Sequence, residues 1–146
     1  MRLAEPKVGS VIRYAYLWHD QAASGAAEGS KDRPALVLAL AIVRASGETE
    51  VLVLAITHAP PRRKMDAVEL SEPVRRRLGL DDEDAWVVTT EANVFVWPGP
   101  DLRPVPGKRP STAFYGEVPM PVLNAVAASY LANRKRQLRT VRRDDP

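Results

Sequence analysis

The chain contains no cysteine among its 146 residues, so it can form neither disulfide bonds nor thiolate metal sites. Its longest unbroken apolar run, residues 35–43, is far shorter than the roughly 20 residues that a membrane-spanning helix needs. The N-terminal residues 1–7 lack the apolar segment of a secretory signal peptide. Together these absences predict a protein of the cytoplasm.

A strong excess of one charge sign is also missing from most of the chain, although the net charge is +3. Residues 134–146 hold six basic and two acidic side chains, which leaves fifteen bases and sixteen acids for the rest. The body of the protein is therefore not globally basic. An anion-binding surface would have to come from local clusters at residues 62–64 or 75–77, or from the tail, whose residues 139–146 we expect to be frayed.

The length and the apolar patterning predict a single domain over residues 1–146 with a modest core. Period-two alternation or continuous apolar character predicts short strands at residues 10–18, 35–43, 51–56, 67–70, 85–90 and 94–97. These strands predict a mainly β fold of the α+β kind, built as a small, partly closed β-barrel. Closure would also protect the apolar sheet from pairing with other chains.

Two helices are expected beside these strands. Ser71 is a good helix cap, Pro73 stands in the first turn and Gly79 suits the position after the last turn, which predicts a short inserted helix. Residues 119–138 carry one apolar stripe at spacings of three and four, which predicts a longer C-terminal helix.

The segment before the most apolar strand has the character of a binding loop. Residues 19–32 are small, polar and rich in glycine, and Arg33 and Pro34 then enter the strand directly. The planar guanidinium of an arginine can donate two parallel hydrogen bonds to a phosphate. Thr57 stands at the end of the next strand, so a phosphate site is one interpretation. The other is that Arg33 pairs with a neighbouring carboxylate at the surface.

These residues resemble a known family, the MazF/PemK (Kid-like) toxins of bacterial toxin–antitoxin systems. Residues 9–14 are similar to the opening glycine and first strand of that family. Glu28, Arg33 and Pro34 match its Glu-x4-Arg-Pro loop, and Thr57 matches the Thr or Ser that ends its following strand.

The resemblance is specific over residues 8–57 and looser over residues 58–97, and it extends to the C-terminal helix. The family usually has a Gln and an Arg after its acidic position, where this chain has Ala92 and Val94. Residues 98–110 have no counterpart in the best-known members. The chain therefore resembles a divergent branch of the family.

The resemblance implies an SH3-like barrel, a homodimer and an endoribonuclease that cuts single-stranded RNA without a metal or cofactor. It also implies neutralisation by a cognate antitoxin protein whose tail covers the RNA groove. Such cleavage uses the neighbouring 2′-hydroxyl of the RNA as nucleophile, so the protein supplies proton transfer and charge stabilisation.

Three residues carry this implied chemistry. Arg33 suits the stabilisation of charge on the phosphorane, and Thr57 could add a neutral hydrogen bond to the same phosphate. Glu28 could orient Arg33 or act as the base.

Three further residues are acid/base candidates. His58 follows Thr57 and His19 opens the long loop, and an imidazole titrates in the useful range. Either histidine could instead face solvent without a role. Glu91 occupies the acidic position of the family. Two histidines so far apart give no metal-site pattern, so we expect no metal.

The remaining motifs have two interpretations each. Arg62, Arg63 and Lys64 could follow the RNA backbone or form a solvated loop, while residues 75–77 are expected to face solvent on the short helix. The three tryptophans, Trp18, Trp86 and Trp97, could stack on bases. Core packing is expected for at least two of the three.

A second hypothesis is a non-catalytic binding module on the same barrel. Ala92 and Val94 motivate it, because a decayed RNA groove can keep its fold. A related fold also serves toxins that poison gyrase by binding protein.

Overall fold

The computed structural model describes residues 4–25, 31–136 and 139–143, the first two residues of the last range by their backbone only. Glu28 lies outside the described residues. The described elements are the strands β1 (Ser10–Tyr14), β2 (Arg33–Ile42), β3 (Thr49–Thr57), β4 (Ala67–Leu70), β5 (Ala85–Val88), β6 (Glu91–Trp97), β7 (Phe114–Glu117) and β8 (Arg139–Arg142), and the helices α1 (His19–Ala23), η1 (Lys64–Asp66), α2 (Glu72–Arg77) and α3 (Met120–Arg134).

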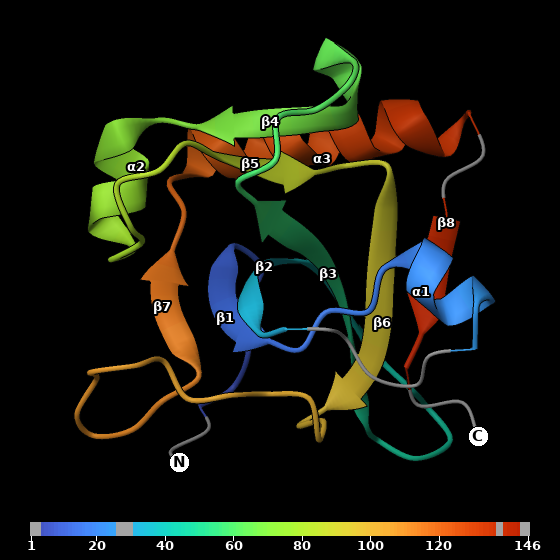
Figure 1. Ribbon diagram of the computed structural model, residues 1–146. Coiled ribbons are helices and arrows are strands. Elements are labelled where there is room, and N and C mark those ends of the chain that lie inside the picture. Colours follow the sequence, from blue (N-terminus) through green and yellow to red (C-terminus); the bar gives the residue numbers. More distant parts are fainter. Residues whose placement is uncertain (1–3, 26–30, 137–138, 144–146) are drawn as a thin grey trace.

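All eight strands belong to one sheet with the order β4-β5-β3-β2-β1-β7, and β6 joins it by pairing with β3 and β8. β3 is the branch point because residues 49–53 pair with β6, whereas residues 56 and 57 pair with β5. The sheet curls into a half-barrel, with α3 lying across the β4–β5 end (Figure 1). The predicted mainly β fold with a short inserted helix and a C-terminal helix is confirmed.

Two apolar clusters hold the sheet in this shape. One lies between the sheet and the helices α2 and α3 and includes Leu36, Leu54 and Val126. The other lies on the opposite face of β1, β2 and β3 and is rich in aromatic side chains, among them Tyr14 and Phe95, whose rings stack with centroids 4.8 Å apart. Among the described residues, no helix combines the length and the apolar character that crossing a membrane requires.

The first predicted strand is shorter than expected, and the predicted long loop begins as a helix. β1 ends at Tyr14 because the next backbone amide, that of Ala15, donates to Asp101 O instead of to a strand of the sheet. α1 then forms at residues 19–23, and its first turn is held by side chains: the amide of Trp18 donates to Gln21 Oε1 at 3.1 Å.

The prediction of a frayed tail is wrong for residues 139–143. Residues 139–142 form β8, which pairs in parallel with β6 along an edge that β3 leaves open. Arg143 then buries its guanidinium, 3% exposed, 3.1 Å from the carboxylate of Asp101. α3 is correspondingly shorter than predicted and ends at Arg134, before the chain returns to β6. Residues 144–146 lie outside the described part.

β6 positions the segment that follows β1 through one buried side chain. Asn93 is fully buried, and its Oδ1 accepts a hydrogen bond from Leu17 N at 2.9 Å. Its Nδ2 donates to Leu17 O at 2.7 Å. This paired contact replaces the ladder bonds that the chain loses after β1, and it fixes the backbone next to Trp18.

Replacing Asn93 by Ala is expected to lower the free energy of unfolding by about 2–4 kcal/mol, since both buried backbone groups of Leu17 lose their partner. Urea denaturation measures this change. Asn124→Ala, an exposed substitution on α3, is the control and should stay within about 0.5 kcal/mol. An equal effect of both variants would contradict the assigned role.

Candidate functional site

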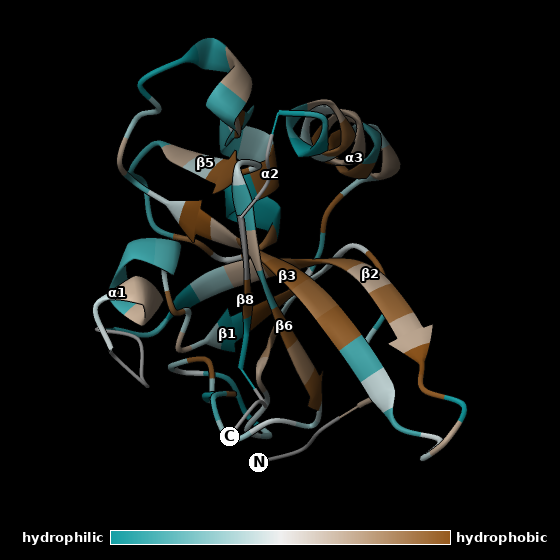
Figure 2. Ribbon diagram, turned by 90° about the vertical axis from the view of Figure 1, so that its right-hand side faces the viewer, coloured by the Kyte–Doolittle hydropathy of each residue, from teal (hydrophilic) through white to brown (hydrophobic). Residues whose placement is uncertain are grey.

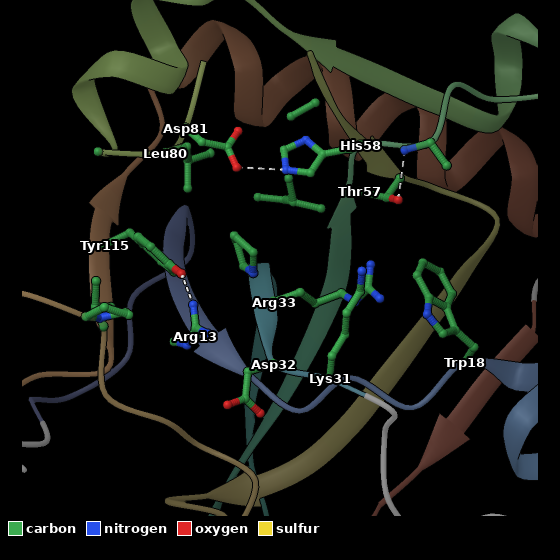
Figure 3. A pocket seen from close by; sticks show the side chains of 17 residues that line it. Arg13, Trp18, Lys31, Asp32, Arg33, Thr57, His58, Leu80, Asp81 and Tyr115 are labelled. Carbon is green, nitrogen blue, oxygen red and sulfur yellow. Dashed lines mark hydrogen bonds and ion pairs between the residues drawn. The ribbon is translucent and has the colours of Figure 1, made fainter. Parts of the chain in front are cut away.

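A pocket of about 620 Å³ opens where the ends of β2 and β3 meet β1, β7 and the turn before β5 (Figure 3). Arg33 and Thr57 both line it, and so do Arg13 and His58. Residues from distant parts of the chain therefore share one cavity. Its size lies in the range of pockets that bind small ligands, about 300–1,000 Å³.

Arg33 enters the pocket as the first residue of β2, where its neighbour across the ladder is Tyr14. Its guanidinium carbon lies 5.0 Å from the centroid of the Trp18 ring, a cation–π contact. Its Nε is buried and, among the described residues, has no hydrogen-bond partner. Burial lowers the pKa of Arg33 from its usual range, but an arginine remains charged at neutral pH. The site thus presents a cation with an unused donor.

The expected alternative, a surface pair between Arg33 and Asp32, is not what the described residues show. Asp32 Oδ1 lies 3.6 Å from Nε of Arg103 instead. Whether Glu28 contacts Arg33 falls outside the described residues.

Thr57 is the last residue of β3, and its Oγ1 accepts a hydrogen bond from Ala59 N at 3.2 Å. Because this contact uses the oxygen only as an acceptor, the hydroxyl proton stays available to a ligand. Figure 3 shows Thr57 above Arg33 in the pocket.

His58 lies at the rim and is bound by the acidic turn before β5. Its Nδ1 lies 2.8 Å from Asp84 O, and its Nε2 lies 3.0 Å from Asp81 Oδ2 and 3.3 Å from Glu83 Oε2. Both ring nitrogens face oxygen acceptors, which favours the doubly protonated ring. The pKa of His58 is raised, first by the hydrogen bond to the backbone of Asp84 and then by the carboxylates. The hydrogen-bond geometry and the raised pKa therefore both favour the charged form of His58.

The same cluster has the composition of a metal site. The ligand atoms of His58, Asp81 and Glu83 lie within 4.8 Å of one another. All three side chains are exposed, and their mutual hydrogen bonds account for the arrangement. No sequence pattern indicated this grouping, because the two acids are far from His58 along the chain.

Glu91 and His19 do not line the pocket. Glu91 Oε2 accepts hydrogen bonds from His19 N at 2.9 Å and from Tyr16 Oη at 3.2 Å, so it holds the start of α1. Burial raises the pKa of Glu91, against the effect of these two donors, and burial together with Glu91 raises the pKa of Tyr16. The geometry of this pocket gives neither Glu91 nor His19 an acid/base role.

The predicted basic clusters also lie away from the pocket. Arg62 and Arg63 are exposed in the loop that leads into η1, and Lys64 is the exposed first residue of η1. The expectation that residues 75–77 face solvent is wrong for Arg75, which is buried. Its Nη1 donates to Leu70 O at 2.7 Å, and its Nη2 lies 3.9 Å from Asp84. This arginine links α2 to the strands beside it.

Arg13 and Tyr115 both line the pocket, although neither had a role in the sequence-based hypotheses. Arg13 Nη1 donates to Tyr115 Oη at 2.9 Å across 102 positions of sequence. Tyr115 lies on β7, which the apolar pattern did not predict. Of the tryptophans, Trp18 lines the pocket, whereas Trp97 packs against Phe114 with ring centroids 5.7 Å apart.

No protein-family model matches the sequence, and no protein of curated function is significantly similar to it. The family resemblance thus depends on the motif residues themselves.

The raised pKa of His58 means that the folded chain binds this proton more tightly than the unfolded chain does. The stabilisation is fully present below the ordinary value of 6.5 and is lost as the pH rises through the folded value. Because His58 is half exposed, we expect at most about 1 kcal/mol. NMR titration of the His58 ring should give a pKa above 6.5 in the wild type and a lower pKa in Asp81→Asn. Equal titration of the two proteins would refute this linkage.

Proposed function

We propose that this protein is a metal-independent endoribonuclease that cleaves single-stranded RNA by attack of the 2′-hydroxyl. The observation that carries the proposal is the pocket in which Arg33, with a buried Nε lacking a partner among the described residues, stands beside Thr57. A half-buried arginine with unused donors is suited to a phosphate.

The chemistry follows from what each side chain can donate. Arg33 would bind two oxygens of the scissile phosphate and stabilise the charge that develops on them. The Thr57 hydroxyl would donate one neutral hydrogen bond to the same group. His58 is the candidate acid for the departing 5′-oxygen, and its Nε2 would have to exchange Asp81 and Glu83 for the substrate to donate that proton.

The carboxylates that line the pocket are already paired, Asp32 with Arg103 and Asp81 with His58. The family resemblance assigns the base or the orienting group to Glu28. The proposal also includes a cytoplasmic location, a homodimer and a cognate antitoxin. β2 and β3 form a hairpin that projects from the body of the molecule (Figure 2). β2 carries exposed apolar residues on this hairpin, such as Ile42 at 73%, which supports a protein partner.

The second candidate is a binding module without catalysis, acting on nucleic acid or on a protein as gyrase poisons do. The observation that favours it is the commitment of Glu91 to α1, which removes the family's acidic position from the pocket. RNA binding without cleavage by the wild-type protein would support this candidate over the nuclease.

Replacing Arg33 by Ala is expected to lower the rate of RNA cleavage by about 10²–10³-fold, the scale of losing one preorganised donor to the transition state. Arg33→Lys should recover only part of the rate, since an ammonium cannot donate in the bidentate manner. The measurement is cleavage of a mixed-sequence single-stranded RNA pool with end mapping, in the presence of EDTA. Arg76→Ala, an exposed arginine on α2 paired with Glu72, is the matched control.

An inactive wild-type protein would rule out the nuclease, whereas equal cleavage by the wild type and Arg33→Ala would rule out the catalytic role of Arg33.

Thr57→Val should reduce cleavage by about three- to tenfold, the value of one neutral hydrogen bond, while Thr57→Ser should retain most activity because it keeps the hydroxyl. The same assay compares the two variants. A Thr57→Ser protein as impaired as Thr57→Val would show that the methyl group, and so packing, is what matters.

A further inference from the structure

The charges that line the pocket are unevenly paired. His58 has carboxylate neighbours, and Asp32 lies by Arg103. The side chain of Arg13, by contrast, has a single hydrogen bond among the described residues, to the neutral hydroxyl of Tyr115. Among the described residues, the guanidinium of Arg33 contacts the Trp18 ring and has no carboxylate partner. Within the described part of the chain, the two guanidinium groups of this cavity are therefore not neutralised by a carboxylate.

The two arginines come from neighbouring rungs of one antiparallel ladder. Arg13 of β1 is paired with Pro34, and Arg33 of β2 is paired with Tyr14. Their side chains then diverge, because Arg33 lies towards Trp18 on one wall and Arg13 towards Tyr115 on the other (Figure 3). The cavity thus has a cation at each of two separate places.

Arg13 is held in place as a binding group would be. Tyr115, from β7, is 8% exposed, so its hydroxyl is fixed by the surrounding core. The hydrogen bond uses Nη1 of Arg13 and leaves the other donors of the fork without a partner among the described residues. A guanidinium oriented in advance loses less side-chain entropy on binding an anion.

The space between the two cations suits more than one phosphate group. The volume of about 620 Å³ far exceeds what a single phosphate fills, and the walls include the apolar side chains of Pro34, Leu80 and Val105. Apolar walls between two cations suit a nucleoside with a phosphate at either end.

We propose that Arg13, positioned by Tyr115, binds a second phosphate of the RNA that neighbours the scissile phosphate at Arg33. The substrate of this pocket is then an RNA segment with at least two consecutive phosphates, and this inference rests on the function proposed above. A dinucleoside monophosphate has one phosphate and would therefore contact only one of the two arginines.

The first experiment measures binding separately from cleavage, with 2′-O-methyl RNA that has no nucleophilic hydroxyl. Mixed-sequence dinucleoside monophosphates are compared without a terminal phosphate, with a 5′-phosphate and with a 3′-phosphate. In the wild type, one of the two added phosphates should strengthen binding by about tenfold, the value of a charge-assisted hydrogen bond. The terminal phosphate that strengthens binding, 5′ or 3′, shows in which direction the RNA runs through the pocket. In Arg13→Gln the gain should vanish.

The second experiment uses the salt dependence of binding to a mixed-sequence 2′-O-methyl octamer. Loss of one phosphate contact should reduce the slope of log K against log salt by about 0.7 in Arg13→Gln, measured between about 50 mM and about 200 mM salt. Tyr115→Phe keeps the charge of Arg13 and the aromatic ring at position 115, but it removes the hydrogen bond that holds the Arg13 guanidinium. The salt slope of this variant should therefore match the wild type while its affinity for the octamer falls. Arg76→Gln is the control and should match the wild type in both.

The outcomes separate this inference from the proposed function. An unchanged slope in Arg13→Gln, together with an undiminished gain from the terminal phosphate, would overturn the second phosphate site even if the RNA is cleaved. The expected differences in binding, with no cleavage of unmodified RNA, would uphold the site and overturn the nuclease. Absence of binding to every probe would overturn both. Circular dichroism melting of Arg13→Gln and of a second variant, Arg13→Lys, verifies that each is folded.

Discussion

The site depends on how the chain satisfies its backbone hydrogen bonds where it leaves the sheet after β1. Buried amide and carbonyl groups without partners are costly, and the ladder no longer supplies any. Two side chains of β6 supply these hydrogen bonds instead. Asn93 binds the backbone N–H and C=O of Leu17, and Glu91 accepts from the backbone N–H of His19. Trp18 lies between these two anchors, and its ring supports the guanidinium of Arg33. Two polar side chains on one strand therefore determine where the pocket has its aromatic wall.

Elements with strong local signals were predictable. The inferred short strand at residues 67–70 coincides with β4, and the cap signals gave the start and end of α2, where Gly79 has a φ of 69°. β7 and β8 carry no such signal, because β7 contains a glycine and β8 is largely basic and polar. Each forms because a neighbouring strand, β1 or β6, offers an open edge. Which edges remain open is a property of the assembled sheet.

The same distinction applies to the site. Arg33 and Thr57 could be inferred since both stand at strand ends, whereas the contact of Arg13 with Tyr115 joins residues 102 positions apart. The sequence also could not show which arginines are bound within the fold and which are open to a ligand. Arg75 leaves its Nε without a partner, as Arg33 does, yet its terminal nitrogens face Leu70 O and Asp84. Arg75 is thereby engaged within the fold, whereas Arg33 remains open to a ligand.

The return of the C-terminal segment to the first strand links the two ends of the chain through one side chain. Nη1 of Arg143 lies 2.8 Å from Ala15 O and 3.4 Å from Asn93 Oδ1, the same amide oxygen that accepts from Leu17. Asn93 Oδ1 is thereby shared between the segment that follows β1 and the segment that follows β8. A substitution at Arg143 would act on the backbone beside Trp18 through this shared oxygen, although Arg143 itself does not line the pocket.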